Sequence, residues 1–575
     1  MSFAWGKALV ALIILAPSPA AASSPLAGMT LEEKVGQLFV VEVYGQDADT
    51  PNAGNQRLYG VDTPAQVIEK YKPGGVIYFD ARRGPDNVRE PRQIATLSNG
   101  LQAAALRQRR HIPLLISTDQ EGGAVVYRLT APATAMPGNM ALGAGRSTRD
   151  ARRSAEVIAA ELKSVGINQN YAPVADVNVN PANPVIGVRS FGEDPALVSR
   201  MVAAQVDGYH AGGTATVAKH FPGHGDTATD SHFGLPEVTH SREQLAAIDL
   251  PPFRSAIRAG VDTIMTAHVV LRSVDPSGAP ATMSKPVLTG LLRGELRYDG
   301  LIVTDALDMG GATGTYPPDV APVEAFKAGA DQLVLAPQLD TAYQAVLGAV
   351  RSGAIPMRRL DESVRRILRL KERRGLFRDP FVDPARAVTT VGRPEHLADA
   401  QAITDRTTTL VRNDAGLLPL GTTPRNVLVA GWGVTTTATI GAALTGRGHA
   451  VDVQETGTAP TQARIDEVVA RSAERDLVVV STQNAAANPQ QRALVAALLA
   501  TGKPVVVAGM RNPYDIAYLG AAPTYLATYG YTAGSIESLV RTLFGEIRPV
   551  GTLPVTIPKA DGSGTLYPFG HGLSY

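Results

Sequence analysis

The stretch KHFPGHGDTATDSHFGLP, residues 219–236, concentrates side chains that can transfer protons or bind metal ions. It holds three of the 10 histidines in the sequence together with two aspartates, and glycines and prolines lie between them. Three kinds of chemistry fit this composition: a metal site, a cradle for phosphate groups, or a loop that gives and takes protons. The spacing of the residues and the backbone they can form distinguish among the three.

The spacing disfavours a metal site. His220 and His224 are four residues apart, as in the zinc-binding pairs of helices. Pro222 and Gly223 lie between them and break the helix that would align the two rings. His232 could still act as a ligand from a loop, but we expect no metal ion in this protein.

A phosphate cradle is disfavoured as well. GHGDTA, residues 223–228, matches the pattern G-x-G-x-x-A that follows a strand in dinucleotide sites. The pattern works only where a helix begins, because the N–H groups of its first turn face the phosphate. Gly234 and Pro236 follow too closely for that helix. A partial match at 431–436, GWGVTT, lacks the third glycine and is better explained as a strand-to-helix turn, so no cofactor is expected.

The third kind of chemistry is proton transfer by Asp230 and His232, which lie two residues apart in this stretch. A carboxylate beside an imidazole favours the charged imidazolium and fixes the orientation of the ring. Such a pair can give and take protons near neutral pH. We therefore predict that residues 219–236 form a flexible loop that transfers protons.

Eight short apolar runs alternate with helix-like segments from residue 30, where Thr30 and Glu33 form a capping box, to about residue 375. Runs that are apolar throughout and separated by helices are typical of parallel strands covered on both faces. Eight such units predict a (β/α)8 barrel. The runs are FVVEV at 39–43, GVIYF at 75–79, PLLIST at 113–118, INQNYAPV at 167–174, TATVAKH at 214–220, DTIMTAH at 262–268, LIVTD at 301–305 and DQLVLA at 331–336.

Polar residues stand at or just after the ends of several of these runs. In a barrel of this kind, the C-terminal ends of the strands and the loops that follow them form the active face. We therefore expect five side chains that are distant in sequence to converge on that face. They are Asp119, Lys219, His220, His268 and Asp305.

A second alternation of apolar strands and helices occupies residues 401–575. It predicts an αβα sandwich with a mainly parallel sheet, smaller than the barrel. Residues 376–400 are rich in proline, glycine and arginine and lack periodicity, so we expect a linker there. The barrel then spans residues 23–375.

The first residues match the pattern of a secretory signal. Lys7 precedes the apolar run 8–16, and an A-x-A sequence follows at 20–22. A membrane anchor needs about 20 apolar residues, and this run is far shorter. We expect residues 1–22 to be removed on export, which leaves a secreted or extracytoplasmic chain without a stable membrane anchor.

The overall composition excludes several kinds of function. The formal net charge is +1 and aromatic residues make up 5% of the chain, which disfavours nucleic-acid binding. Cysteine is absent, so disulfides, thiolate metal sites and a cysteine nucleophile are excluded. A chain of 575 residues is too long for one hydrophobic core and indicates more than one domain.

The stretch 219–236 resembles the loop motif of the bacterial β-N-acetylglucosaminidases of glycoside hydrolase family 3, two-domain type. The resemblance runs from about residue 28 to the C-terminus, and β-glucosidases of the family share the Lys-His pair but lack the D-x-H loop. It includes STDQEGG, APVADVNVNPANPVIGVRSFGEDP, MTAHV, IVTDALDMGG, LVRNDAGLLPL and the terminal YPFGHGLSY.

The resemblance also implies a role for individual residues. Asp305 would be the nucleophile, His232 the general acid/base and Asp230 the partner of His232. Asp119, Arg189, Lys219 and His220 would bind sugar hydroxyls. Arg128 matches a further binding arginine, although GGAVVYRL carries one residue more than the usual spacing.

Two other carboxylates compete for the role of proton donor. Retaining glycosidases commonly use a pair of carboxylates about 5 Å apart, one as nucleophile and one as acid/base. A His–Asp pair departs from that scheme. Glu121 in DQEGG and Asp308, three residues after Asp305, therefore remain alternatives to His232.

Together these features predict an exported, exo-acting β-N-acetylglucosaminidase that works by double displacement without a metal ion. We expect a monomer whose partner is an oligosaccharide with terminal N-acetylglucosamine (GlcNAc), from cell-wall muropeptides or chitin. A β-glucosidase, a broad β-hexosaminidase and a GlcNAc phosphorylase remain alternatives within the family. A metal-dependent hydrolase and a non-catalytic glycan-binding protein are alternatives from other classes.

Overall fold

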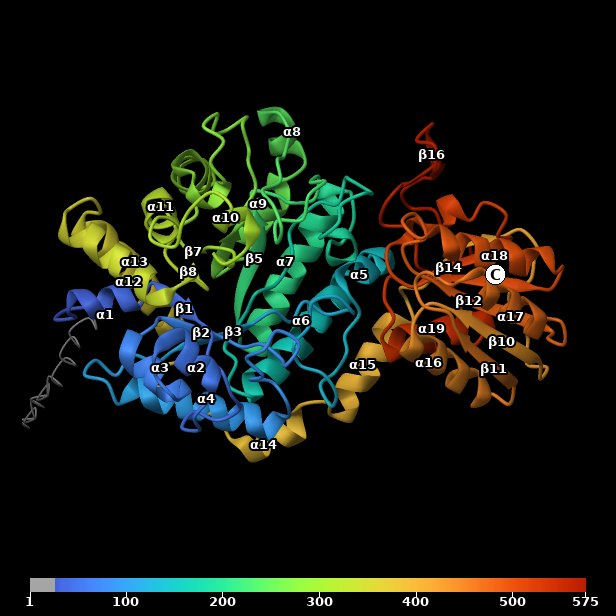
Figure 1. Ribbon diagram of the computed structural model, residues 1–575, viewed down its shortest axis with the longest axis horizontal. Coiled ribbons are helices and arrows are strands. Elements are labelled where there is room, and N and C mark those ends of the chain that lie inside the picture. The colour runs from blue at the N-terminus through green and yellow to red at the C-terminus, as the bar shows by residue number, and fades with distance from the viewer. Residues whose placement is uncertain (1–25) are drawn as a thin grey trace, which may run out of the picture.

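The computed structural model describes residues 26–575, so the predicted signal segment lies outside the described residues. It shows two α/β units that lie side by side, with the chain running from blue in the first unit to red in the second (Figure 1). The first unit is an eight-stranded parallel sheet surrounded by helices, and the second is a six-stranded sheet with helices on both faces. The fold class predicted from the sequence is confirmed.

Each of the eight predicted strands is present in the first sheet, in which every strand pairs with its neighbours in chain order. β1 also pairs with β8, and a parallel bridge from Val303 to Gln332 joins β7 to the approach to β8 and closes the barrel. The strands are β1 (Phe39–Val41), β2 (Gly75–Ile77), β3 (Leu115–Thr118), β4 (Gln169–Asn170), β5 (Ala215–Phe221), β6 (Thr263–Thr266), β7 (Leu301–Val303) and β8 (Leu333–Val334).

Helices surround this barrel, and α1 begins with the capping box predicted at Thr30 and Glu33. They are α1 (Leu31–Gly36), α2 (Ala53–Tyr59), α3 (Pro64–Tyr71), α4 (Pro91–Leu106), α5 (Asn139–Gly145), α6 (Thr148–Ser164), α7 (Pro195–Gly212), α8 (Arg242–Ala247), α9 (Leu250–Arg258), α10 (Gly310–Thr313), α11 (Ala321–Ala328), α12 (Leu339–Arg351) and α13 (Met357–Arg373). The barrel unit also has two short 3-10 helices, η1 (Gly187–Arg189) and η2 (Ala281–Met283), and one π-helix, η3 (Pro286–Glu295).

The barrel interior is filled by apolar side chains from almost every strand, including Ile77, Val217, Met265 and Val334. This layer makes the interior a packed core rather than a pore, as is usual for eight-stranded barrels. A ligand can therefore enter only from an end, among the loops that follow the strands.

The segment predicted as an irregular linker contains two helices, α14 (Pro384–Thr390) and α15 (Pro394–Thr404). Both start at a proline, which is preorganised for the first position of a helix and needs no hydrogen-bond partner there. Ala387 and Ile403 pack against the barrel core, so this segment is part of the folded structure. Two prolines of this segment stand at the first positions of helices, so the proline-rich composition did not mean that the segment is irregular.

The second sheet has the strand order β11-β10-β12-β13-β14-β9, in which five strands are parallel and β9 is antiparallel to β14. Its strands are β9 (Thr409–Asn413), β10 (Asn426–Gly431), β11 (Ala450–Glu455), β12 (Leu477–Thr482), β13 (Val505–Gly509) and β14 (Thr524–Ala527). The helices α17 (Gln462–Ser472) and α18 (Pro489–Ala500) pack on one face, and α16 (Val434–Thr445) and α19 (Ala533–Leu543) pack on the other. The turn η4 (Pro513–Tyr518) follows β13, and the hairpin β15 (Ile557–Pro558) and β16 (Thr565–Tyr567) lies near the C-terminus.

The two units share a hydrophobic core. Met140, Ala141 and Ala144 of α5 and Val188 of η1 belong to the same cluster of buried side chains as the strands and helices of the second unit. Arg146 also donates to the Thr552 hydroxyl across this interface, over 2.6 Å. Among residues 26–575, no helix has the length and apolar character needed to cross a membrane.

Candidate active site

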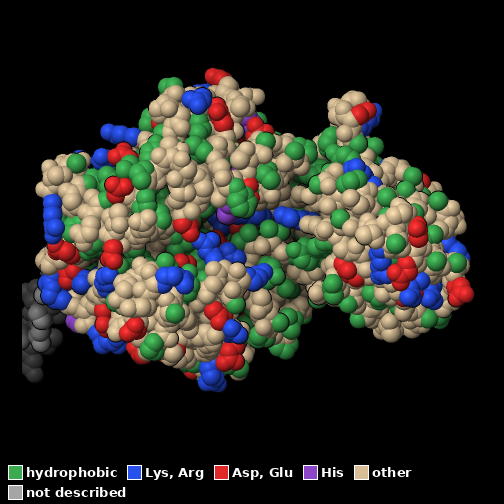
Figure 2. Space-filling view, in the orientation of Figure 1, with side chains coloured by type: hydrophobic (Ala, Val, Ile, Leu, Met, Phe, Trp, Pro, Cys, Tyr) green, Lys and Arg blue, Asp and Glu red, His purple; other side chains and the backbone are tan. Residues whose placement is uncertain are grey.

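A pocket opens at the C-terminal ends of the barrel strands, above the apolar interior layer. Basic and histidine side chains gather in the hollow at the centre of the face shown in Figure 2. Most predicted site residues line this pocket, namely Asp119, Arg128, Arg189, Lys219, His220, His232 and Asp305, although they come from distant parts of the sequence.

One wall of the pocket is a network of buried charges. Arg189 makes two bonds to Glu121, from Nε to Oε2 at 2.9 Å and from Nη2 to Oε1 at 2.8 Å. Lys219 Nζ lies 2.8 Å from Glu121 Oε1 and 2.7 Å from Asp119 Oδ1. Arg128 lies further away, with its Nη2 3.7 Å from Asp119 Oδ2. The network presents charged hydrogen-bonding groups of both signs to the pocket.

The cations in this network determine the ionisation of Glu121. Burial raises the pKa of the Glu121 carboxyl, but contact with Arg189 and Lys219 outweighs burial, so that the pKa lies below its ordinary value. Glu121 therefore stays a carboxylate and has no proton to give. This disfavours Glu121 as the general acid and makes it a structural counter-ion.

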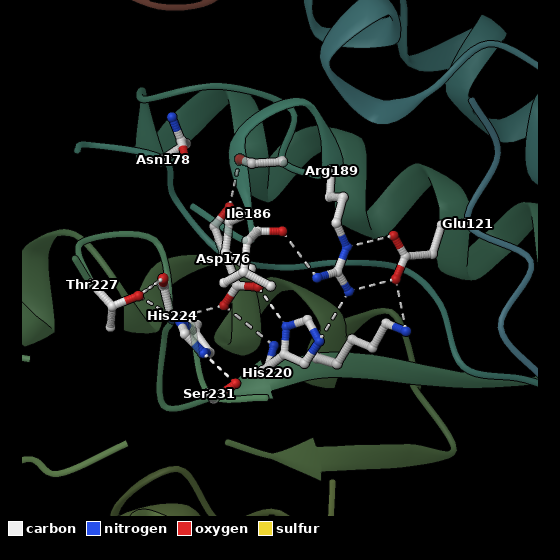
Figure 3. Close-up of polar contacts among 12 residues, drawn as sticks. Glu121, Asp176, Asn178, Ile186, Arg189, His220, His224, Thr227 and Ser231 are labelled. Carbon is white, nitrogen blue, oxygen red and sulfur yellow. Dashed lines mark hydrogen bonds and ion pairs between the residues drawn. The ribbon is translucent and has the colours of Figure 1, made fainter. Parts of the chain in front are cut away.

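A second set of contacts orients His220, as Figure 3 shows. Asp176 is fully buried, and its Oδ2 lies 2.7 Å from Nδ1 of His220. Asp176 Oδ1 also accepts from the backbone N–H of His224, at 2.8 Å. Nε2 of His220 is directed toward the Arg189 guanidinium, 3.3 Å away. Asp176 thus fixes the ring whose other edge faces the pocket.

Asp305 lies two residues beyond β7, where it faces the pocket. Within residues 26–575, the hydrogen bond to its side chain comes from the backbone N–H of Ala306 to Oδ1, at 2.8 Å. Partial removal from water raises the pKa of the Asp305 carboxyl, but nearby His220 and His268 outweigh it, so the pKa lies below its ordinary value. The second oxygen is left free to act as a nucleophile.

His232 and Asp230 form a pair on the loop between β5 and α8. His232 Nδ1 lies 2.7 Å from Asp230 Oδ1, and the His232 backbone N–H donates to the same oxygen at 2.9 Å. The His232 side chain is half exposed, and its ring borders the pocket. The D-x-H spacing therefore produces the oriented carboxylate–imidazole pair that the sequence predicted.

Two of the earlier expectations, those for His268 and Asp308, need correction or closer placement. His268 does not line the pocket, because its ring lies below the surface between Ala306 O and Thr282 Oγ1, 2.9 Å from each. Asp308 does not line the pocket itself, but lines a neighbouring cavity with Glu42 and pairs at 2.8 Å with Arg83, which borders the pocket. His220, His224 and His232 all border the pocket, and among the described residues no group of three or more His, Cys, Asp or Glu side chains could hold a metal ion.

Comparison with known proteins decides the family. Residues 30–370 match the glycosyl hydrolase family 3 N-terminal domain, and residues 408–575 match the family 3 C-terminal domain. The chain belongs to glycosyl hydrolase family 3. The family resemblance predicted from the loop motif is thus confirmed, and the family 3 chain is a glycosidase.

Individual relatives of this family 3 glycosidase cover most of its length. It is 37% identical to a β-hexosaminidase A from Pseudoalteromonas piscicida over 68% of this chain and 69% of the relative. It is 31% identical to a β-N-acetylglucosaminidase/β-glucosidase from Cellulomonas fimi over 92% of this chain and 94% of the relative. A solved family 3 β-N-acetylglucosaminidase from Paenibacillus sp. superposes with a TM-score of 0.83 at 39% identity, covering 92% of this chain and 99% of that one.

Sequence reasoning missed the residues that support the pocket from below. Asp176 lies in a stretch whose neighbours are apolar, and nothing in the local pattern connects it with His220, 44 residues later. His224 was considered only as a metal ligand, whereas its Nε2 contacts Ser231 Oγ at 2.9 Å and its Nδ1 contacts Thr227 Oγ1 at 2.7 Å. Only the role of Asp176 needs a long-range contact to find it, because the partners of His224 lie three and seven residues away in sequence.

Proposed function

We propose that this family 3 glycosidase is an exo-acting, retaining β-N-acetylglucosaminidase that removes terminal β-linked GlcNAc from oligosaccharides. The observation that supports this proposal is the presence of Asp305, His232 and the Arg189–Glu121–Lys219 network around one pocket. The names of its relatives, β-hexosaminidase A and β-N-acetylglucosaminidase/β-glucosidase, point to the same substrate class.

The first step would form a covalent glycosyl-enzyme. The free oxygen of Asp305 attacks the anomeric carbon while the bond from that carbon to the leaving oxygen breaks. The imidazolium of His232 gives its proton to the leaving oxygen, which departs as an alcohol. Asp230 stabilises the imidazolium before the transfer and fixes the ring afterwards.

The second step would return the enzyme to its starting state. His232, now neutral, takes a proton from a water molecule as the water oxygen bonds to the anomeric carbon. The bond to Asp305 breaks, the carboxylate is restored, and the sugar leaves with its original anomeric configuration. The half-exposed position of His232 lets both the leaving group and the incoming water reach it.

The shape of the pocket supports attack at a chain end. The apolar layer inside the barrel closes the pocket from below with Ile77, Tyr171, Met265 and Val334. A terminal sugar can enter such a closed pocket, whereas the middle of a polysaccharide cannot pass through it. Asp119, Arg189, Lys219 and His220 would then hold the ring hydroxyls by charge-assisted hydrogen bonds.

A panel of substrates tests the proposal. We expect nitrophenyl β-GlcNAc to be cleaved with a higher kcat/KM than nitrophenyl β-glucoside, and the released sugar to have the β configuration when followed by NMR. A preference for glucose would identify a β-glucosidase instead. GlcNAc-1-phosphate as the product in phosphate buffer would identify a phosphorylase, and inactivation by EDTA would identify a metal-dependent hydrolase.

We also propose that the natural substrate is a cell-wall muropeptide or a chitin oligosaccharide met outside the cytoplasm. The predicted signal segment at residues 1–22 supports this location. N-terminal sequencing of protein from the extracytoplasmic fraction should give a chain that starts near Ser23. Purified protein that retains Met1 and stays with the cytoplasmic fraction would contradict export.

A further inference from the structure

The Arg189–Glu121 pair is carried by loops and not by barrel strands. Arg189 ends the short turn η1 in the connection between β4 and α7, and Glu121 lies in the loop after β3. The Arg189 side chain is 9% exposed and that of Glu121 is 2% exposed, so both are fixed deep in the pocket wall. A loop holds a side chain this closely only when other contacts fix its backbone.

Three asparagines fix the backbone of the Arg189 turn. Asn178 Oδ1 accepts from Gly187 N at 3.1 Å, and Asn139 Nδ2 donates to Arg189 O at 2.7 Å. Both of these belong to the first unit. The third, Asn512, follows β13 of the second unit, and its Oδ1 accepts from Val188 N at 3.0 Å.

The approach of Asn512 to the turn is close. Gly187 has φ +44°, and a Cβ atom placed there would lie 2.6 Å from Asn512 Oδ1. Val188 is buried in the core that the two units share, with 5% of its surface exposed, so losing the bond to Asn512 would cost the turn a largely buried hydrogen bond. The turn therefore depends on the second unit for this hydrogen bond.

The second unit also contacts the Glu121 side of the pair. The Tyr531 hydroxyl, from the loop after β14, donates to Ala124 O at 2.9 Å, three residues beyond Glu121. Asn178 in turn contacts the Tyr514 hydroxyl of η4 at 3.2 Å. Loops at the carboxyl end of the second sheet thus reach the backbone on both sides of the ion pair.

We propose that Asn512 of the C-terminal domain is a positioning residue for the sugar-binding Arg189. This inference rests on the proposed function, because it takes Arg189 to bind the sugar. Asn512 does not line the pocket and would act only through the η1 turn. A charged hydrogen bond to a sugar requires close alignment, and a displacement of about 1 Å can reduce the rate by about 100-fold.

Kinetics of two Asn512 variants test the proposal. Asn512→Ala removes the acceptor oxygen, and we expect kcat/KM to fall at least about tenfold, with KM raised and kcat lowered. Asn512→Asp keeps an acceptor for Val188 N and should remain within about threefold of wild type. Equal losses in both variants, or no loss in either, would overturn the proposal.

Thr552→Val is the matched control for a general effect of the domain interface. It removes the bond from Arg146 to the Thr552 hydroxyl, which crosses the same interface without touching the Arg189 turn. We expect its kinetics to match wild type even where its melting temperature falls as far as that of Asn512→Ala. A loss of activity in Thr552→Val as large as in Asn512→Ala would show that only interface stability matters.

A double-mutant cycle decides whether Asn512 acts through Arg189. In an Arg189→Ala background, Asn512→Ala should add less than about a twofold loss, because the side chain that it positions is already absent. Fully additive losses would overturn the proposal. The cycle uses whichever nitrophenyl glycoside the wild type cleaves, so a preference for glucose would refute the proposed specificity while leaving this test intact.

Discussion

Glu121 and Asp305 both lie among cations at the pocket, yet they differ in what touches them. Glu121 has both oxygens occupied, by Arg189 and by Lys219. The Asp305 side chain accepts a hydrogen bond from Ala306 N. Its negative charge is stabilised by the nearby His220 and His268, which make no hydrogen bond to it. A carboxylate is thus a fixed counter-ion at one position and the proposed nucleophile at the other.

The role proposed for Asp305 predicts the result of removing its charge. Asp305→Asn keeps the shape of the side chain and should lower kcat by at least about three orders of magnitude, because no glycosyl-enzyme can form. A 2-fluoro glycoside should label Asp305 in the wild type, and mass spectrometry of peptides can locate the label. Labelling of Glu121 or Asp308 would contradict the assignment.

Lys219 connects the two carboxylates of the pocket wall, Asp119 and Glu121. In Lys219→Ala the ammonium is lost, and each hydrogen bond to a charged group contributes about 1.5–3 kcal/mol. We therefore expect kcat/KM to fall by about 10- to 100-fold, with KM raised and kcat lowered together. Lys34→Ala, which removes a more exposed ion pair with Asp361, is the control. Unchanged kinetics in Lys219→Ala would show that the sugar does not bind at this end of β5.

At the scale of an element, the loop that carries His232 is attached at several points. The buried ring of His224 contacts Ser231, the residue between Asp230 and His232. The carbonyl oxygens of Ser231 and His232 accept from the amides of Gly311 and Gly310, at 2.9 and 3.0 Å. A side chain at either glycine would approach this loop within 3.1 Å, so the two glycines allow the loop to pack against α10.

Replacing the two loop histidines should have different consequences. His232→Ala removes the proposed proton donor, so the first step should slow far more for a disaccharide than for a nitrophenyl glycoside. The glycosyl-enzyme should then accumulate and give a burst of released nitrophenol. Azide needs no general base and should restore turnover. His224→Ala removes the contact with Ser231 that holds the loop, and azide should not restore turnover in this variant. Absence of rescue in His232→Ala, with no intermediate accumulating, would contradict proton transfer by this loop.

His224 also predicts how the stability of the fold depends on pH. Burial lowers the pKa of the His224 imidazole from 6.5 to about 4. The unfolded chain therefore binds a proton that the folded chain does not between these values, and folding should lose up to about 3 kcal/mol as pH falls from 6.5 to 4. Urea unfolding at pH 7 and pH 5 should show a smaller decrease in His224→Gln than in wild type. An equal decrease in both proteins would refute this assignment.

At the scale of the whole molecule, the shared core and the Asn512 contact connect the folding of the two units. The sequence has two tryptophans, and Trp5 lies in the predicted signal segment, so Trp432 is the one expected in the exported chain. Trp432 packs against Tyr531 in the second unit, with ring centroids 5.1 Å apart. Its fluorescence reports on the second unit, while activity reports on the barrel.

Unfolding in urea should therefore show a single transition, at the same urea concentration, whether it is followed by Trp432 fluorescence or by activity. Met140→Ala creates a cavity in the shared core and should lower the free energy of unfolding by about 2–5 kcal/mol, with both transitions displaced together. Activity that disappears well before the fluorescence changes would show that the units unfold independently. The variant Val434→Ala, on an exposed side chain of α16, is the control for a change that leaves the shared core intact.

The sequence predicted the elements better than it predicted their long-range contacts. All eight barrel strands overlap the predicted runs, and seven of them are short, mainly apolar segments that can be recognised from neighbouring residues alone. β4, Gln169–Asn170, is polar and was found only because it lies within the predicted run 167–174. Asp176 and Asn512 could not be found, because their partners lie 44 and 324 residues away in sequence.

The contact between the loop that carries His232 and α10 lets the amides of Gly310 and Gly311 report on the motion of that loop. Both amide hydrogens are protected while they are hydrogen-bonded to the Ser231 and His232 carbonyl oxygens. Their exchange with deuterium therefore measures how often the loop leaves the barrel, without any label on the catalytic residues. A sugar that holds the loop closed would slow the exchange of a peptide that it never touches.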